Sequence, residues 1–479
     1  MSGSSMLVRF PMFFLLAVTN AGWAHAKPMP EKLPPAFHHN RLDEVYRRSG
    51  DGLVLLRGEM DWFRKRELRA FDPSFRETNF KQEKNLYYLT GIEVPNSFVL
   101  IDPKKKEVHL YTDWDSEPEI EEARKLGISG IHPAAAFMRD ARIRAEAYDI
   151  LYTLYVPLLE DGTLFGKTHV MTGLFPPGMG EPVTEEQQFA KRLQEIFPGH
   201  RIKSLYPVVY DMQKIKRPEE IELLREANRV TVQGVLEAIR AIRPGIYDHD
   251  VRAAVEYTFV REGASATAFS ANLMSGPNMF KKLVQLFSNY SHRDRKLDAG
   301  DAVFIDIGAE VSYYLSDVGR TVPVSGKFSP EQRRLYEVYL PCFLDSVRAV
   351  RPGVTQADLV NICADAVERQ MPGLKEPYVR RAAEAFIEQI RSQPTLGHYV
   401  DMNVIGAGPQ PDEPLEPGMV FAIEPVLYWE ELDFAIFAED IVLVTEDGYE
   451  NLSPGMPYTV DEIEALMAEP SLLDREERE

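Results

Sequence analysis

The sequence predicts an α/β (α+β) protein with two domains, and three observations support this. The chain has 479 residues, which exceeds what one compact hydrophobic core usually holds. In the first half, short apolar runs alternate with helical patterns, as in α/β domains. In the second half, amphipathic helices alternate with strands linked by turns, so we expect an antiparallel sheet backed by helices.

The first 26 residues have the pattern of a secretory signal peptide. Arg9 precedes an apolar stretch over 10–18, and Ala24-His25-Ala26 has the small residues of a cleavage site. Cleavage after Ala26 predicts a periplasmic or secreted protein without a membrane segment. The alternative is an uncleaved N-terminal anchor, which Pro11 disfavours because proline interrupts a helix.

An N-terminal α/β domain is predicted over 37–211. Its expected strands cover 53–56, 97–101 and 108–111, and a helix is expected over 118–126. The stretch 165–184 is rich in Gly and Pro and is predicted to be a loop. Composition alone would make 85–91 a strand and a turn.

A second domain is predicted over 212–468, followed by a polar tail over 469–479. Pro218 with Glu219 and Glu220 has the composition of a first helical turn, so a helix is expected to begin there. Further helices are expected over 248–262, 330–350 and 355–368.

Five side chains in this half have the chemistry of a two-metal site. Asp306 ends a buried-strand run, and Asp317 follows it by eleven positions. Glu424 ends a second apolar run, Glu439 comes fifteen positions later, and His398 lies between the two pairs. Such a hard, oxygen-rich set suits two divalent ions, above all Mn²⁺. The alternative interpretation is that these residues have no function beyond the fold and are solvated acids at strand ends and turns.

These stretches resemble the pita-bread metallopeptidases aminopeptidase P and prolidase. The resemblance rests on Phe304-Ile305-Asp306-Ile307-Gly308-Ala309-Glu310, Ser316-Asp317-Val318-Gly319-Arg320-Thr321, Gly397-His398, Glu416-Pro417-Gly418-Met419-Val420, Ile423-Glu424-Pro425 and Glu439-Asp440-Ile441-Val442. Residues 85–91, Asn-Leu-Tyr-Tyr-Leu-Thr-Gly, resemble a signature of the N-terminal domain of the same enzymes, which methionine aminopeptidases lack. The resemblance implies a creatinase/aminopeptidase P-like α/β domain followed by a pita-bread domain.

The resemblance also implies a role for each ligand. Asp317 and Glu439 would bridge two ions, Asp306 would bind one of them, and His398 with Glu424 would bind the other. Glu424 would also be the catalytic group that accepts the proton of the attacking water. The implied activity is that of an exported Xaa-Pro aminopeptidase acting on peptides with proline in the second position, in a dimer or tetramer. An Xaa-Pro dipeptidase, or a metal-binding relative with weak or no peptidase activity, is the alternative.

Four positions depart from the family pattern. Where the family usually carries three further histidines, this chain has Asn289, Pro394 and Ile405, and His292 is an alternative match to the first. Where the family commonly has Arg, it has Phe437. These residues predict a more apolar substrate pocket. Three explanations are open: other groups take the place of the histidines, the substrate differs, or turnover is slow. The candidate replacement groups are Asn289, Tyr399, Asp401 and Asn403.

Charge and cysteine content set two further expectations. The chain has 54 basic and 74 acidic residues, a net charge of −20, and nucleic-acid binding needs a basic surface instead. Only two cysteines occur, Cys342 and Cys363. An exported protein could pair them, but both fall within predicted helices, where buried free thiols are common, so free thiols are the expectation.

Overall fold

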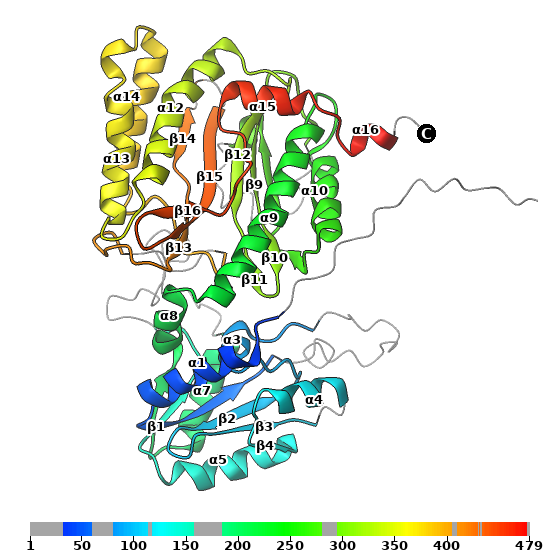
Figure 1. Ribbon diagram of the computed structural model, residues 1–479, viewed down its shortest axis with the longest axis vertical. Coiled ribbons are helices and arrows are strands. Elements are labelled where there is room, and N and C mark those ends of the chain that lie inside the picture. The colour runs from blue at the N-terminus through cyan, green and yellow to red at the C-terminus, as the bar shows by residue number, and fades with distance from the viewer. Residues whose placement is uncertain are drawn as a thin grey trace, which may run out of the picture.

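The computed structural model describes residues 32–59, 80–113, 117–157, 184–279, 295–404, 410–429, 431 and 434–476. In these residues the chain forms two bodies, each built on its own sheet (Figure 1). The first body lies at the bottom of the view in blue and cyan, and the second lies above it. The α/β first half and the antiparallel second half predicted from the sequence are both confirmed.

The N-terminal body contains a mixed six-stranded sheet in the order β4-β3-β2-β1-β5-β6. Its strands are β1 (Gly52–Arg57), β2 (Phe98–Asp102), β3 (Glu107–Tyr111), β4 (Gly130–His132), β5 (Ile150–Thr153) and β6 (Arg201–Ser204). The central strand β1 pairs antiparallel with β2 and parallel with β5.

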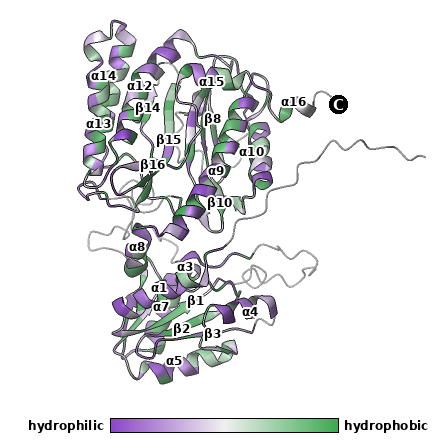
Figure 2. Ribbon diagram, viewed as in Figure 1, coloured by the Kyte–Doolittle hydropathy of each residue, from purple (hydrophilic) through white to green (hydrophobic). Residues whose placement is uncertain are grey.

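Both faces of this sheet are covered, because successive side chains of a strand point to opposite faces. Val54 and Leu56 pack on the side of α1 (Pro35–Arg48) and α3 (Lys84–Thr90). Leu53 and Leu55 pack on the other side, against α5 (Phe137–Ala145) and α7 (Glu185–Ile196). The helix α4 (Glu117–Lys125) follows β3. The strands are accordingly coloured mainly as hydrophobic in Figure 2, while the helices carry both colours.

The segment that composition alone would make a strand and a turn is the helix α3. Its first turn is capped by Glu83, whose carboxylate accepts hydrogen bonds from the backbone N–H of Asn85 and Leu86. Gly91 ends the helix in the left-handed conformation, with a φ of 70°, which glycine adopts without steric cost. The two capping residues, Glu83 and Gly91, therefore make this segment a helix, although Tyr87 and Tyr88 favour a strand.

The C-terminal body is built on an antiparallel sheet in the order β13-β15-β12-β9-β8, with β14 and β16 also paired to β15. Its strands are β8 (Asn272–Ser275), β9 (Ala302–Ile307), β12 (Val318–Pro323), β13 (Val420–Ile423), β14 (Val426–Trp429), β15 (Phe434–Val444) and β16 (Tyr449–Asn451). A smaller sheet holds β7 (Ala266–Thr267), β10 (Ala309–Val311) and β11 (Tyr314–Leu315).

Helices flank these sheets. The long helix α9 (Pro218–Ala241) contacts β9, β10 and β12, and α12 (Pro330–Ala349) contacts β13 and β15. The others are α10 (Asp248–Glu262), α13 (Gln356–Glu368), α14 (Pro377–Arg391), α15 (Val460–Met467) and α16 (Leu473–Glu476). Helix α8 (Tyr206–Lys214) lies between the two bodies and contacts α1 of the first (Figure 1). Among the described helices, none has both the length and the apolar composition needed to cross a bilayer.

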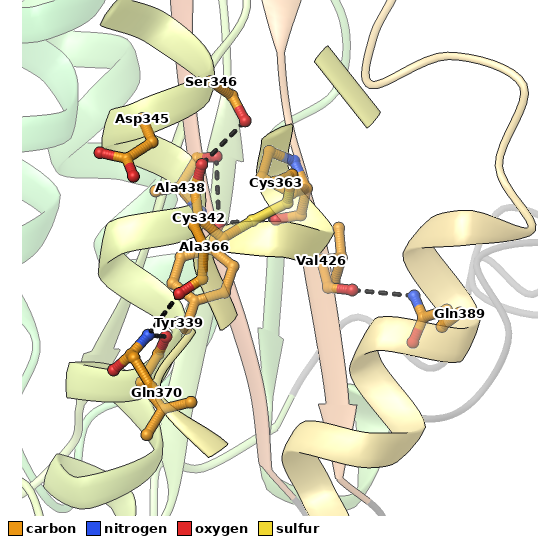
Figure 3. The surroundings of a disulfide bond; sticks show 12 residues. Tyr339, Cys342, Asp345, Ser346, Cys363, Ala366, Gln370, Gln389, Val426 and Ala438 are labelled. Carbon is orange, nitrogen blue, oxygen red and sulfur yellow. Dashed lines mark hydrogen bonds between the residues drawn. A yellow bond between two sulfur atoms is a disulfide. The ribbon is translucent and has the colours of Figure 1, made fainter. Parts of the chain in front are cut away.

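The prediction of free thiols was wrong. Cys342 of α12 and Cys363 of α13 form a disulfide, with their Cα atoms 4.2 Å apart (Figure 3). Both residues are fully buried. Periodicity correctly placed each cysteine on a helix. It could not show that the two cysteines face each other, because that depends on how α12 packs against α13.

The predicted signal peptide over 1–26 lies outside the described residues, as does the predicted loop over 165–184 except for Thr184, which caps α7. The first sheet ends with β6 at Ser204, and α9 begins at Pro218, as the proline and acidic first turn predict.

Candidate metal centre

Three neighbouring strands bring the predicted carboxylates together. Asp306 lies in β9, Asp317 directly precedes β12, and Glu439 lies in β15. Gly319 of β12 pairs with Asp306 on one side and with Glu439 on the other. Residues far apart in sequence are therefore side by side because the antiparallel register places them there.

The remaining two predicted ligands join this group. Glu424 directly follows β13, and His398 lies in the segment after α14. His398 Nε2 lies 3.3 Å from Glu424 Oε1 and 3.9 Å from Asp317 Oδ2. Ligand atoms of Asp317, His398 and Glu439 all fall within 4.8 Å of one another. The structure thus gathers the five residues that the sequence singled out.

The site has a buried side and a more open side. Asp317, His398 and Glu439 are buried, whereas Asp306 and Glu424 are only partly so, with 32% of the Glu424 side chain exposed. Solvent, or a ligand from solvent, reaches the group from the side of these last two carboxylates.

Burial shifts the pKa of every member, and repulsion between carboxylates adds to the shift at Asp317, Glu424 and Glu439. Burial raises the pKa of Asp317 and Glu439 well above the usual range, and neighbouring carboxylates raise it further. Burial and the charge of Asp306 raise the pKa of Glu424 to about 8. Burial lowers the pKa of His398, which keeps the imidazole in the neutral form that binds metals. Four carboxylates clustered in this way disfavour the charged form, and cations bound between them would offset that cost.

Two buried oxygens test whether the residues fit metal ions. Asp317 Oδ1 and Glu439 Oε1 are buried and accept no hydrogen bond from the described residues. An unpaired buried acceptor costs about 1–3 kcal/mol, and more when it is charged. The family resemblance gives the bridging role to these same two carboxylates. Cations at this position would satisfy both oxygens, so the donor set fits a dinuclear centre.

Close backbone contact positions the histidine. Ala422 N donates to His398 O across 2.9 Å. A Cβ atom at Gly397 would lie 1.9 Å from Ala422 O, so only glycine permits this approach. Gly397, which was noted in the sequence only as the neighbour of His398, therefore lets the imidazole reach the carboxylates.

Sequence reasoning missed two groups that support the ligands. Asn272 of β8 donates from Nδ2 to Asp306 Oδ2 across 2.9 Å. Lys216, fully buried between α8 and α9, forms an ion pair with Asp401, three residues after His398. Neither stands out in the sequence, because an asparagine in a strand and a lysine before a helix are usually solvated.

The departures from the family pattern occupy different surroundings. Pro394 is exposed. Phe437 is only 1% exposed and stacks on Phe304, with ring centroids 4.1 Å apart. Its ring lies against Gly319, where a Cβ atom would come within 1.9 Å of it. Asn289, His292 and Ile405 lie outside the described residues, so the expected apolar pocket stays a prediction.

Comparisons with known proteins agree with this geometry. Residues 222–446 match the metallopeptidase family M24, and residues 64–130 match the aminopeptidase P N-terminal domain. The chain is 28% identical over 418 residues to the Xaa-Pro aminopeptidase of Escherichia coli, which covers 82% of this chain and 90% of that protein. It is 30% identical over 251 residues to the Xaa-Pro dipeptidase of Pyrococcus furiosus, over 52% of this chain and 66% of that protein.

Solved structures support the fold. The low-pH form of aminopeptidase P from E. coli superposes with a TM-score of 0.71 at 23% identity, over 91% of this chain and 99% of that one. Both bodies of the chain thus have counterparts in a single known architecture.

Proposed function

Because this chain belongs to metallopeptidase family M24 and carries an aminopeptidase P N-terminal domain, we propose that it is an exported Xaa-Pro aminopeptidase that uses two divalent ions. The observation that carries the proposal is the set of four carboxylates and one neutral imidazole, with two buried oxygens left without hydrogen bonds. Mn²⁺ suits these oxygen and imidazole ligands best.

The five residues divide the chemistry among them. Asp317 and Glu439 would hold both ions, Asp306 one of them, and His398 with Glu424 the other. Bound divalent ions lower the pKa of a coordinated water and polarise a peptide carbonyl. Glu424, on the open side of the site, would accept the proton of that water and pass it to the leaving nitrogen. The peptide would present an N-terminal residue followed by proline.

Two observations favour alternative functions. The similarity to a Xaa-Pro dipeptidase over 52% of the chain favours a dipeptide substrate as the second candidate. The buried Phe437, at a position where the family commonly has Arg, favours a relative that binds metal but turns over slowly. Loss of one donor to a developing oxyanion typically costs roughly 10²–10³ in rate.

Export is part of the proposal. The apolar stretch with Ala24-His25-Ala26 supports it, and the disulfide between Cys342 and Cys363 supports it independently, because disulfides persist mainly in oxidising compartments. N-terminal sequencing of the native protein should begin at Lys27. An intact Met1 on cytoplasmic protein would refute export without touching the proposed chemistry.

The decisive experiment compares Xaa-Pro-Xaa tripeptides with Xaa-Pro dipeptides as substrates, with added Mn²⁺. Faster release of the first residue from tripeptides supports the aminopeptidase, and faster cleavage of dipeptides supports the dipeptidase. Glu424→Gln serves as a control that should abolish turnover. Binding of Mn²⁺ without hydrolysis of either substrate would leave only the weak or inactive relative. Sedimentation analysis would test the predicted dimer or tetramer.

A further inference from the structure

We propose that the buried ion pair between Lys216 and Asp401 is a positioning device for the metal centre, which fixes the His398 and Asp317 segments relative to each other. The inference rests on the proposed function, since it concerns the same metal ligands. Lys216 precedes α9, at the junction of the two bodies, and Asp401 lies three residues after His398.

The pair is closed to solvent. The Lys216 side chain is 0% exposed and that of Asp401 is 9% exposed, and Lys216 Nζ lies 3.1 Å from Asp401 Oδ2. Lys216 Nζ also donates to the Gln213 carbonyl and lies 5.4 Å from the centroid of the Tyr399 ring. A buried charge that lost its partner would carry a large desolvation penalty, so the contact tolerates little movement of the segment.

Asp401 connects Lys216 to the segments that carry His398 and Asp317. Its Oδ1 accepts hydrogen bonds from the backbone and side-chain nitrogens of Asn403, at 2.8 and 3.0 Å. Its backbone carbonyl accepts a 2.8 Å hydrogen bond from Leu315 N, two residues before Asp317. One residue thus shapes the turn that follows His398 and ties it to the strand that leads to Asp317.

The charge state of the pair is consistent with this role. Burial by itself would raise the pKa of Asp401. The charge of Lys216 and the hydrogen bonds from Asn403 outweigh burial and hold the pKa below its ordinary value. Asp401 is therefore a carboxylate at neutral pH, and its bonds to Asn403 and Lys216 are charge-assisted and strong.

The first body contributes to the same arrangement. Asn85 of α3 accepts a 3.2 Å hydrogen bond from Gln213 of α8, and the carbonyl of Gln213 accepts from Lys216. Lys84 of α3 donates to the Asn403 side chain. Helix α3 of the N-terminal body therefore contacts Gln213 and Asn403, each of which is hydrogen-bonded to one partner of the pair.

The test measures metal affinity and does not depend on turnover. Three proteins are stripped of metal with a chelator and titrated with Mn²⁺ by calorimetry. They are the wild type, Lys216→Met, and the double variant that combines Lys216→Met with Asp401→Asn. The double variant leaves no buried charge unpaired, so it keeps the proposal testable where the single variant fails to fold. Lys214→Met is the matched control, because Lys214 also joins α8 to the second body, but through Glu413 and Glu416 instead of Asp401.

We expect both pair variants to bind Mn²⁺ about tenfold or more weakly, as is typical when a group that orients a metal ligand is lost, and Lys214→Met to bind as wild type does. In metal-free protein, amides of 398–404 should exchange with deuterium faster in the pair variants than in the control. Wild-type Mn²⁺ affinity in either folded pair variant would overturn the inference. A wild-type protein that binds Mn²⁺ but cleaves neither Xaa-Pro substrate would instead refute the proposed function and leave this inference standing.

Discussion

Arg320 and Asp440 form an ion pair in which both side chains are fully buried, with Arg320 Nη2 2.8 Å from Asp440 Oδ1. The guanidinium also donates to the backbone carbonyl of Glu439 across 2.9 Å and to that of Pro457. It lies 4.9 Å from the centroid of the Tyr458 ring. The pair therefore joins β12 to β15 beside the expected bridging ligand.

Arg320→Met should strongly destabilise the protein, because it leaves the buried carboxylate of Asp440 without its cation. Removal of one partner of a buried pair typically costs about 3–5 kcal/mol. Denaturant unfolding measures the loss. Arg381→Ala breaks a half-exposed pair with Glu431 and should cost less than about 1 kcal/mol; equal losses in the two variants would contradict the assigned role of Arg320.

Phe437→Arg, which restores the residue common in the family, should destabilise this protein. Phe437 stacks on Phe304 and its ring lies against Gly319, so a guanidinium there would be buried and would lose the ring contact. We expect a loss of about 3 kcal/mol or more, and a smaller loss for Phe437→Leu. Chemical denaturation of both variants measures this. A Phe437→Arg variant as stable as wild type would mean that the ring stack is readily replaced.

Glu220 should make stability depend on pH. It is buried and accepts a hydrogen bond from the Tyr314 hydroxyl, and burial raises its pKa to about 7. A carboxyl whose pKa is higher in the folded than in the unfolded state stabilises the protein at low pH. That stabilisation is lost as pH rises from about 4.5, the unfolded value, to about 7.

Glu220→Gln should remove this contribution. The difference in unfolding free energy between wild type and variant should shift by roughly 2–3 kcal/mol against wild type between pH 4.5 and pH 7.5. Taking the difference cancels the opposite effect of His38, whose pKa burial lowers to about 4. Parallel pH profiles for the two proteins would show that Glu220 ionises normally in the fold.

Asp317→Ala should remove both metal ions, whereas Asp306→Ala should chiefly weaken one. The reason is that Asp317 is central to the group and has an unpaired buried oxygen, while Asp306 already accepts a hydrogen bond from Asn272. Elemental analysis of Mn²⁺-saturated, dialysed protein counts the ions. About one ion per wild-type chain at saturation would contradict the dinuclear centre.

Reduction of the disulfide should lower stability without removing the metal centre. Cys342 and Cys363 close a loop between α12 and α13 with a sequence separation of 21, and a loop of this length contributes about 3 kcal/mol in the chain-entropy account. The variant Cys342→Ala with Cys363→Ala should unfold at a lower temperature than wild type under oxidising conditions. Under reducing conditions the two melting temperatures should converge; a persistent gap would point to cavity effects of the substitutions instead.

The five candidate ligands could be proposed from the sequence because each has a suitable local context and because their order resembles that of a known family. Asp306 and Glu424 end apolar runs, and His398 follows a glycine. Helix starts were predictable for the same reason, as at Pro218, where the fixed φ of proline and an acidic first turn favour helix initiation. Local chemistry was sufficient for the helix start, whereas the choice of the five ligands also rested on the family resemblance.

The disulfide, the cation for Asp440 and the position of Phe437 were decided only by the tertiary structure. Each depends on which residues of distant segments face each other, as Cys342 faces Cys363 and Phe437 faces Phe304. Lys216 is the clearest case. Its sequence context predicts a solvated lysine before a helix, but in the fold it is buried against Asp401, 185 positions away. Sequence patterns report local propensity and the buried face of each element. The pairing of buried groups is set by how those faces pack together, because a buried charge or ring is stable only with the partner that packing supplies.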